Sequence, residues 1–131
     1  MAHLRDVTFD CRHPASLARF WAEALEGYAV APYDEAELER LRDLGVEDPE
    51  DDPTVLVVGP VGAPRIFFQR VPEAKVVKNR VHLDLVADDA DAEADRLEAL
   101  GATRQEAQPD DRFIVLGDPE GNELCLMRAV S

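Results

Sequence analysis

The sequence is short of the features that mark secreted, membrane-spanning and zinc-binding proteins. It has no run of 18 apolar residues, and its N-terminus, MAHLRDVTFD, lacks the basic stretch and apolar run of a signal peptide. We therefore expect a soluble, cytoplasmic protein. The two cysteines, Cys11 and Cys125, have neither the number nor the spacing of a zinc site. Strand alternation predicts that they face opposite sides of their strands, so we expect two unpaired thiols.

Basic residues are also scarce. There are 14 Lys and Arg against 28 Asp and Glu, which gives a net charge of −14. Such a charge repels phosphate backbones and anionic lipid head groups, so we expect neither nucleic acid nor a membrane surface as a partner. Hydrophobic residues nonetheless make up 46% of the chain, which is enough for one core. The length of 131 residues predicts a single domain over 1–131.

A weak internal repeat divides the chain. The segments DVTFDC (6–11) and RVHLDL (80–85) share the order polar, Val, polar, apolar, Asp, apolar. A glycine, Gly27 or Gly101, lies 19 positions after the third residue of each segment. The repeat predicts a first module over about 1–72 and a related second module over about 80–131. A linker over 73–79 joins them.

Each module has the pattern of a strand, a helix and three further strands. Apolar residues at helical spacing follow Pro14 in the first module and Asp88 or Asp89 in the second, and these residue types suit a helix start. The turn sequences PVGAP and DPEGN each separate two alternating runs, as in β-hairpins. The strands predicted after the helices lie at 28–31, 54–59 and 65–71 and at 103–107, 112–117 and 122–128. The predicted fold class is therefore α+β, with two βαβββ modules that form a curved mixed sheet.

The first module carries an acidic insert at 34–53, DEAELERLRDLGVEDPEDDP. Its first part has helical spacing through Leu38 and Leu41, and the rest is an acidic loop bounded by prolines. Two interpretations stay open: a solvated decoration that lowers the isoelectric point, or a lid or partner-binding element.

Alternation along the strands also predicts one sheet face with many polar side chains. Apolar residues of each first strand face the helix, and the polar residues face away. Four side chains occupy matching positions in the first and last strands and converge if the sheet curls; they are Thr8, Gln69, His82 and Glu123. The same face carries Asp10, Phe67, Asp84, Cys125 and Met127. Exposure to water explains a single aspartate on such a face, whereas the matching positions favour a site.

Several motifs resemble the vicinal oxygen chelate superfamily, and in particular its glyoxalase-like branch with the bleomycin resistance proteins and dihydroxybiphenyl dioxygenases. The motifs are RFW followed by LEGY, then FFQRVPEAKVVKNRVHLDL, and finally LGDPEGNELCLM. The resemblance covers nearly the whole chain apart from the insert. It implies a central cup made by two βαβββ modules, with the first strand of each module beside the last. It is also consistent with a homodimer, since many relatives dimerise.

In metal-using members of the superfamily, four side chains at the strand centres hold one divalent ion. The resemblance carries these positions over to Thr8, Gln69, His82 and Glu123. Only the second module keeps the expected pair, His82 and Glu123, and the neutral hydroxyl of Thr8 is a poor ligand. The candidate metal ligands are therefore His82, Glu123 and Gln69. We expect no tightly bound cofactor, with one divalent metal ion as the alternative.

The sequence leaves several functions open. The main hypothesis is a protein that binds or transforms a small molecule in the cup without a tightly bound metal. The alternative is a metal-dependent lyase or isomerase of the glyoxalase type, with His82 and Glu123 as catalytic residues. In an enzyme, a carboxylate in a partly apolar cup can have a raised pKa and act as the base. A dioxygenase is disfavoured, because iron needs a facial triad and the site has one clear imidazole.

A binding protein would use the polar sheet face to hold its ligand. The candidate ligand-binding residues are Thr8, Asp10, Phe67, Gln69, Asp84, Cys125 and Met127. The acidic composition favours a cationic ligand, and the apolar lining favours an aromatic one. A cup filled by its own side chains, in a domain that serves only as an interaction module, is the third hypothesis.

Overall fold

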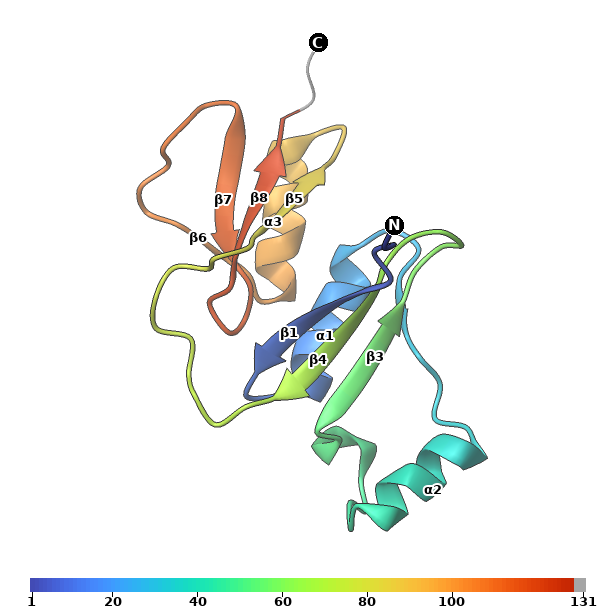
Figure 1. Ribbon diagram of the computed structural model, residues 1–131. Coiled ribbons are helices and arrows are strands. Elements are labelled where there is room, and N and C mark those ends of the chain that lie inside the picture. The colour runs from blue at the N-terminus through green and yellow to red at the C-terminus, as the bar shows by residue number, and fades with distance from the viewer. Residues whose placement is uncertain (129–131) are drawn as a thin grey trace. The chain divides into compact units, whose positions relative to one another are not determined.

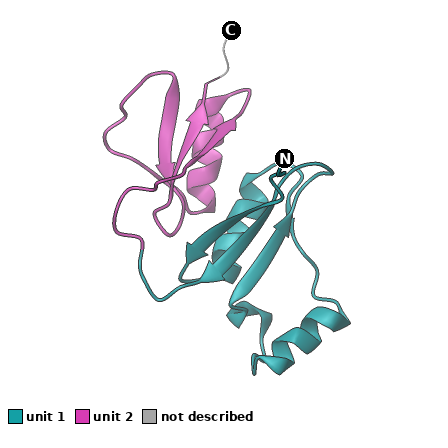
Figure 2. Cartoon of the chain, in the orientation of Figure 1, with its two compact units in different colours: residues 1–74 teal, residues 75–131 magenta. Residues whose placement is uncertain are grey.

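The structure, a computed structural model, describes residues 1–128. Residues 129–131, which end the predicted second module, lie outside the described part. The chain divides into two compact units, unit 1 (Met1–Ala74) and unit 2 (Lys75–Ser131), shown in different colours in Figure 2. No helix within residues 1–128 combines the length and the apolar content that a membrane span needs.

Unit 1 is a four-stranded mixed sheet with a helix on one face (Figure 1). Its elements are β1 (Asp6–Cys11), α1 (Pro14–Ala24), β2 (Ala29–Val30), α2 (Glu35–Asp43), the 3-10 helix η1 (Pro49–Asp51), β3 (Thr54–Val58) and β4 (Arg65–Arg70). The strand order is β1-β4-β3-β2, in which β1 and β4 are parallel and the other neighbours antiparallel. The first strand therefore lies beside the last, as the family resemblance implied.

Unit 2 repeats this arrangement without the insert. Its elements are β5 (Leu83–Val86), α3 (Ala90–Leu100), β6 (Thr103–Arg104), β7 (Phe113–Gly117) and β8 (Glu123–Met127). The strand order is β5-β8-β7-β6, and again only the pair of first and last strands is parallel. The predicted α+β fold with two βαβββ modules is confirmed.

The core of unit 1 is aromatic. Helix α1 begins with Pro14, whose fixed φ and missing N–H suit the first helical turn. Leu17 and Trp21 on its inner face are almost fully buried. The Trp21 ring meets Phe9 of β1 edge to face at a centroid distance of 5.3 Å, and Phe9 lies equally close to Phe68 of β4. These ring contacts hold α1 against the sheet.

The core of unit 2 uses smaller side chains. The Asp89 carboxylate accepts a hydrogen bond from the backbone N–H of Ala92 and so caps α3. Of the two predicted caps, Asp88 and Asp89, the second is therefore the one used. The inner face of α3 presents Ala94 and Leu97, which are fully buried, and the sheet below contributes Leu124 and Leu126 of β8. Small residues on the helix let it lie close to the sheet.

The first strand of unit 2 starts later than the sequence predicted. The expected strand covered 80–85, whereas β5 covers Leu83–Val86, so His82 immediately precedes it. Before this strand, the backbone N–H of Asn79 donates to the Glu123 carboxylate at 3.0 Å. The chain before His82 thus bonds to a side chain of β8 and joins the strand ladder only afterwards.

Candidate functional site

The sheet face opposite α1 in unit 1, and opposite α3 in unit 2, is here called the outer face. In β4, Ile66 and Phe68 are buried on the helix side, whereas Phe67 and Gln69 alternate with them and belong to the outer face. The same alternation in β8 places Cys125 on the outer face of unit 2. The assignment of faces from the sequence is therefore correct.

Unit 1 has a pocket of about 470 Å³ on its outer face, within the range of roughly 300–1,000 Å³ typical of small-molecule sites. Strands β3 and β4 provide its floor, and the insert with the segment before it provides its wall. The floor residues are Thr54, Leu56, Arg65 and Phe67, and the wall residues are Ala31, Pro32, Tyr33, Glu37, Arg40 and Asp52. Residues of the insert therefore line part of this pocket.

A buried carboxylate fastens the insert to unit 1. Asp52 is 1% exposed and accepts hydrogen bonds from Arg40 Nη2 and the Tyr33 hydroxyl, both at 2.7 Å, and from the backbone N–H of Thr54 at 2.9 Å. Burial alone would raise the pKa of Asp52, but these bonds outweigh it and lower the pKa. Burial and the neighbouring Asp52 carboxylate raise the pKa of Tyr33, so its hydroxyl stays protonated and donates.

The second guanidinium at the pocket is also paired. Arg65 donates from Nε to the Asp6 carboxylate at 2.8 Å, and its guanidinium lies 5.3 Å from the centroid of the Phe67 ring. This geometry is that of a cation–π contact. Both pocket cations, Arg40 and Arg65, thus have carboxylate partners.

Only one of the predicted residues of unit 1 lines this pocket. Phe67 is part of the floor. Thr8 and Asp10 are exposed on the neighbouring strand β1, where they are the register partners of Phe67 and Gln69. The structure therefore brings these four residues onto one stretch of the outer face, with Thr8, Asp10 and Gln69 outside the pocket lining.

In unit 2, Glu123 is held by the preceding linker. Its carboxylate accepts a hydrogen bond from Lys75 Nζ at 2.8 Å and another from the backbone N–H of Asn79 at 3.0 Å. Burial opposes ionisation of Glu123, but these bonds prevail and lower its pKa to about 2. The raised pKa expected of a catalytic base is therefore wrong for Glu123. Lys75 and Asn79 also show that the predicted linker is partly folded onto unit 2.

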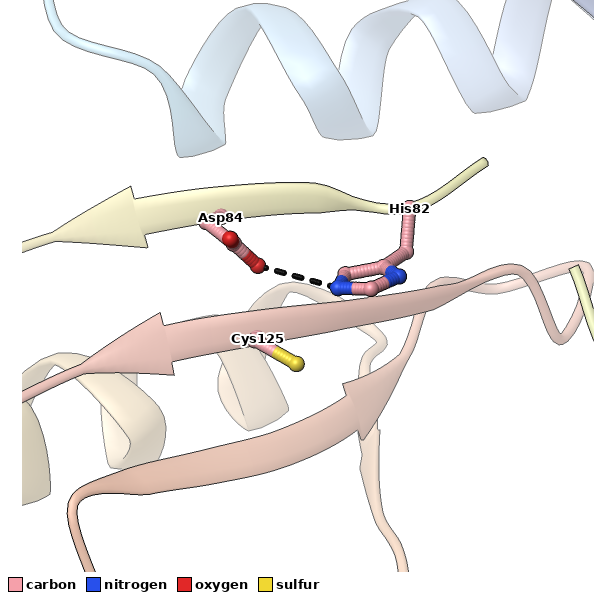
Figure 3. A group of neighbouring side chains, drawn as sticks. All are labelled: His82, Asp84 and Cys125. Atoms are coloured by element: carbon pink, nitrogen blue, oxygen red, sulfur yellow. Dashed lines mark ion pairs between the residues drawn. The ribbon is translucent and has the colours of Figure 1, made fainter. Parts of the chain in front are cut away.

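The other predicted residues of unit 2 form a cluster on its outer face (Figure 3). His82 Nε2 lies 3.1 Å from Asp84 Oδ1, and one donor atom each of His82, Asp84 and Cys125 lie within 4.8 Å of one another. Burial raises the pKa of the Cys125 thiol, and the charge of Asp84 adds to the effect. Met127 follows two residues after Cys125 on the same face of β8.

The sequence interpretation missed the residues that fasten the insert, contact Phe67 or hold Glu123 in place. These residues are Tyr33, Arg40, Asp52, Arg65, Lys75 and Asn79. One signal was present: Tyr33, Arg40 and Asp52 cluster within and beside the insert, and an arginine within a mainly acidic segment needs a carboxylate partner if it is buried. Which carboxylate would serve depends on how the insert folds back onto β3.

The four positions that the resemblance implies for a metal ion do not fit one as they stand. Both oxygens of Glu123 are engaged by Lys75 and Asn79, so an ion would have to displace an ammonium group. His82 is already turned toward Asp84. Thr8 offers only a neutral hydroxyl, which is a poor ligand.

Comparison with known proteins identifies the family. The model of the glyoxalase-like domain matches residues 6–127. A search among curated proteins finds no match. The fosfomycin resistance protein FosX from Mesorhizobium loti has a TM-score of 0.63 at 17% identity, over 99% of this chain and 94% of that chain.

Two further solved structures are similar. A glyoxalase/bleomycin resistance protein/dioxygenase family enzyme from Burkholderia phytofirmans PsJN has a TM-score of 0.65 at 19% identity, over 98% of this chain and 100% of that chain. The third structure is a variant of FosX from Listeria monocytogenes, complexed with Mn(II) and 1S,2S-dihydroxypropylphosphonic acid. It has a TM-score of 0.64 at 10% identity, over 99% of this chain and 92% of that chain. At these identities the likeness shows the fold. Because the family model spans nearly the whole chain, the protein belongs to the glyoxalase-like domain family of the vicinal oxygen chelate superfamily.

Proposed function

We propose that this glyoxalase-like protein binds a small molecule with an aromatic ring, and that it does so without a tightly bound metal ion at the four positions the family implies. The observation that carries the proposal is the pocket of about 470 Å³ on the outer face of unit 1. Phe67 and Leu56 give its floor an apolar surface, and the insert adds polar groups at the wall. A mostly apolar hollow with a few polar groups is typical of ligand sites.

The charges around the pocket favour a neutral or cationic ligand. The charged groups at or beside the pocket are three carboxylates and two guanidinium groups, so their sum is negative. They belong to Asp6, Glu37, Asp52, Arg40 and Arg65. The two cations are used within the protein, so neither is free to bind an anion. The net charge of −14 also attracts cations and repels anions over a longer range.

An NMR titration of the 15N-labelled protein tests this proposal. Benzylamine is expected to shift the amide signals of β3, β4 and the insert, and phenylacetate, an anion with the same ring, is expected to shift them less. Phe67→Ala should abolish the benzylamine shifts. Phe113→Ala, which removes a half-buried ring from β7 in unit 2, is the matched control and should leave them in place. Benzylamine shifts that survive Phe67→Ala would contradict the proposal.

A metal-dependent lyase or isomerase that uses His82 and Glu123 is the second candidate. It is favoured by the likeness to the Listeria FosX variant complexed with Mn(II). For this function Glu123 would have to leave Lys75. Titration with Mn²⁺, followed by the relaxation of water protons, tests it. Binding by the wild-type protein that is lost in Glu123→Gln and strengthened in Lys75→Met would establish the metal site and contradict the metal-free proposal.

We propose a cytoplasmic homodimer whose partner is a small-molecule ligand, with no nucleic-acid or membrane partner. Size-exclusion chromatography with light scattering tests the dimer, and fractionation of the source cells tests the location.

A further inference from the structure

The cluster on the outer face of unit 2 is built by the sheet itself. Asp84 of β5 and Cys125 of β8 are directly paired residues of two parallel strands. His82 precedes Asp84 by two residues and turns its ring toward the carboxylate (Figure 3). Two of the three positions are therefore fixed by the strand ladder, and the third lies one residue before it.

The spacing of the three donor atoms suits a small cation. They lie within 4.8 Å of one another, with 3.1 Å between His82 Nε2 and Asp84 Oδ1. Ligands of a tetrahedral zinc ion, at about 2.0–2.3 Å from the metal, lie about 3.3–3.7 Å apart. The backbone already brings the residues together, so the donor–donor distances exceed this spacing by no more than about 1.5 Å.

The donor types select the class of ion. An imidazole nitrogen, a carboxylate oxygen and a thiolate sulfur form a mixed set that favours Zn²⁺ or Cd²⁺ over Mg²⁺, Ca²⁺ and Mn²⁺, which prefer oxygen. The side chains of His82 and Asp84 are 41% and 57% exposed, so an ion can reach them. Three protein ligands also leave a fourth position open for water or another ligand.

We propose that His82, Asp84 and Cys125 form a binding site for one thiophilic divalent cation, such as Zn²⁺. On binding, the Cys125 thiol releases its proton to solvent and the sulfur bonds to the ion as a thiolate. The cation also removes the repulsion that otherwise arises between this thiolate and the Asp84 carboxylate. The site lies in unit 2, so it goes beyond the ligand pocket proposed for unit 1.

This site differs from the metal positions that the family resemblance implies. Only His82 belongs to both sets. Glu123, the family position on β8, lies two residues before Cys125 and is tied to Lys75. The proposed site leaves this ion pair intact, whereas a metal at the family position would break it.

Titration of the full-length, reduced, metal-free protein with Cd²⁺ tests the proposal. Bonding of cadmium to a thiolate produces a charge-transfer absorbance in the ultraviolet. One equivalent of Cd²⁺ should saturate this band in the wild-type protein. Cys125→Ser should abolish the band, while Cys11→Ala, the matched control that removes the only other thiol, should keep it.

Calorimetric titration with Zn²⁺ reports on the two ligands that give no absorbance. His82→Ala and Asp84→Asn should each weaken binding by at least about 10- to 100-fold, because even indirect partners of a metal contribute that much. An excess of Mg²⁺ should not compete. Circular dichroism of each variant shows whether it is folded, so loss of binding in a folded variant supports the site.

Three outcomes overturn the proposal. The first is a cadmium band that persists in Cys125→Ser. The second is binding of Zn²⁺ that Glu123→Gln abolishes and Cys125→Ser leaves unchanged, which would place the ion at the family position. The third is the absence of saturable binding to the wild-type protein. None of these outcomes bears on the benzylamine titration of unit 1, so the two proposals fail separately.

Discussion

The two units share one topology but use their outer faces differently. In unit 1 the outer face carries a pocket whose wall includes residues of the insert. The buried Asp52 carboxylate fastens the insert to this unit. In unit 2 the outer face carries small groups of donor atoms, around Asp84 and around Glu123, and residues 75–128 include no counterpart of the insert. The same strand order therefore carries a pocket in one unit and a cluster of exposed polar side chains in the other.

The contrast between the units indicates which part of a repeated module can diverge. The strand order is set by backbone hydrogen bonds and by apolar residues on the helix side, such as Phe68 in unit 1 and Leu126 in unit 2, which are buried in both. Outer-face residues contribute little to these cores. They can therefore change without loss of the fold, and the two units show two results of such change.

The anchor of the insert offers the strongest test of this comparison. Asp52→Asn keeps the shape of the side chain but removes the charge that Arg40 and the Tyr33 hydroxyl bind. We expect a loss of about 2–4 kcal/mol in the free energy of unfolding, because the partly exposed Arg40 guanidinium loses its buried partner and keeps only Glu37. This partial exposure keeps the effect below the upper limit. Urea unfolding followed by circular dichroism measures it.

A neighbouring acid supplies the control for this variant. Asp51→Asn makes the same change of charge at an exposed position one residue earlier in the chain. It should alter stability by no more than about 0.5 kcal/mol. Equal effects of the two variants would mean that the insert is held by general charge and not by the Asp52 network, and the contrast between the units would then lose its basis.

What the sequence predicted well was local. The bounds of β1, the side of each strand that faces a helix, and the cap of α3 by an aspartate all follow from spacing within a few residues of chain. The strand order followed from the family resemblance. Such features depend on strand alternation and helix capping, which neighbouring residues determine by themselves.

What the sequence did not predict depends on residues far apart in the chain. Lys75 and Glu123 are 48 positions apart, and Asp6 and Arg65 are 59 positions apart. Alternation places Glu123 on the correct face but cannot show that a lysine of the linker folds back onto it. The expected rise in the pKa of Glu123 is wrong for this reason, because its pKa depends on partners that lie outside its own strand.

Two glycines at corresponding positions, at the ends of β3 and β7, differ in the space around them. A Cβ atom at Gly59 would overlap the ring of Tyr28, whose hydroxyl donates to the Pro64 carbonyl at 2.8 Å. At Gly117 the nearest atoms, including Gln105 Nε2, would lie 3.6 Å away, an ordinary contact. We expect Gly59→Ala to cost about 1–3 kcal/mol through overpacking.

The corresponding variant in unit 2, Gly117→Ala, should be neutral or more stable by up to about 1 kcal/mol, since alanine lowers the entropy of the unfolded chain. Urea unfolding of both variants, with the fluorescence of the single tryptophan, Trp21, as a probe of unit 1, measures the difference. A larger loss for Gly117→Ala than for Gly59→Ala would show that the turn of unit 2 is the tighter one, contrary to the structure.

The smallest effect concerns Glu123 and depends on pH. Its pKa is lowered from 4.5 to about 2 in the folded protein, so the unfolded chain binds a proton more readily between these values. The carboxylate therefore stabilises the fold fully above pH 4.5 and loses this contribution as the pH falls to about 2. Because Lys75 and Glu123 are both partly exposed, we expect Glu123→Gln to lower the free energy of unfolding by only about 1–2 kcal/mol at neutral pH.

The difference between the wild-type protein and Glu123→Gln should then shrink toward zero as the pH approaches 2, and urea unfolding at a series of pH values follows it. Glu106→Gln, which removes a carboxylate at an exposed position of the same unit, is the matched control. A difference that stayed constant with pH would mean that Glu123 titrates alike in the folded and unfolded protein. In that case Lys75 and Asn79 do not hold the carboxylate, and Glu123 would be available on the outer face as a base or a metal ligand.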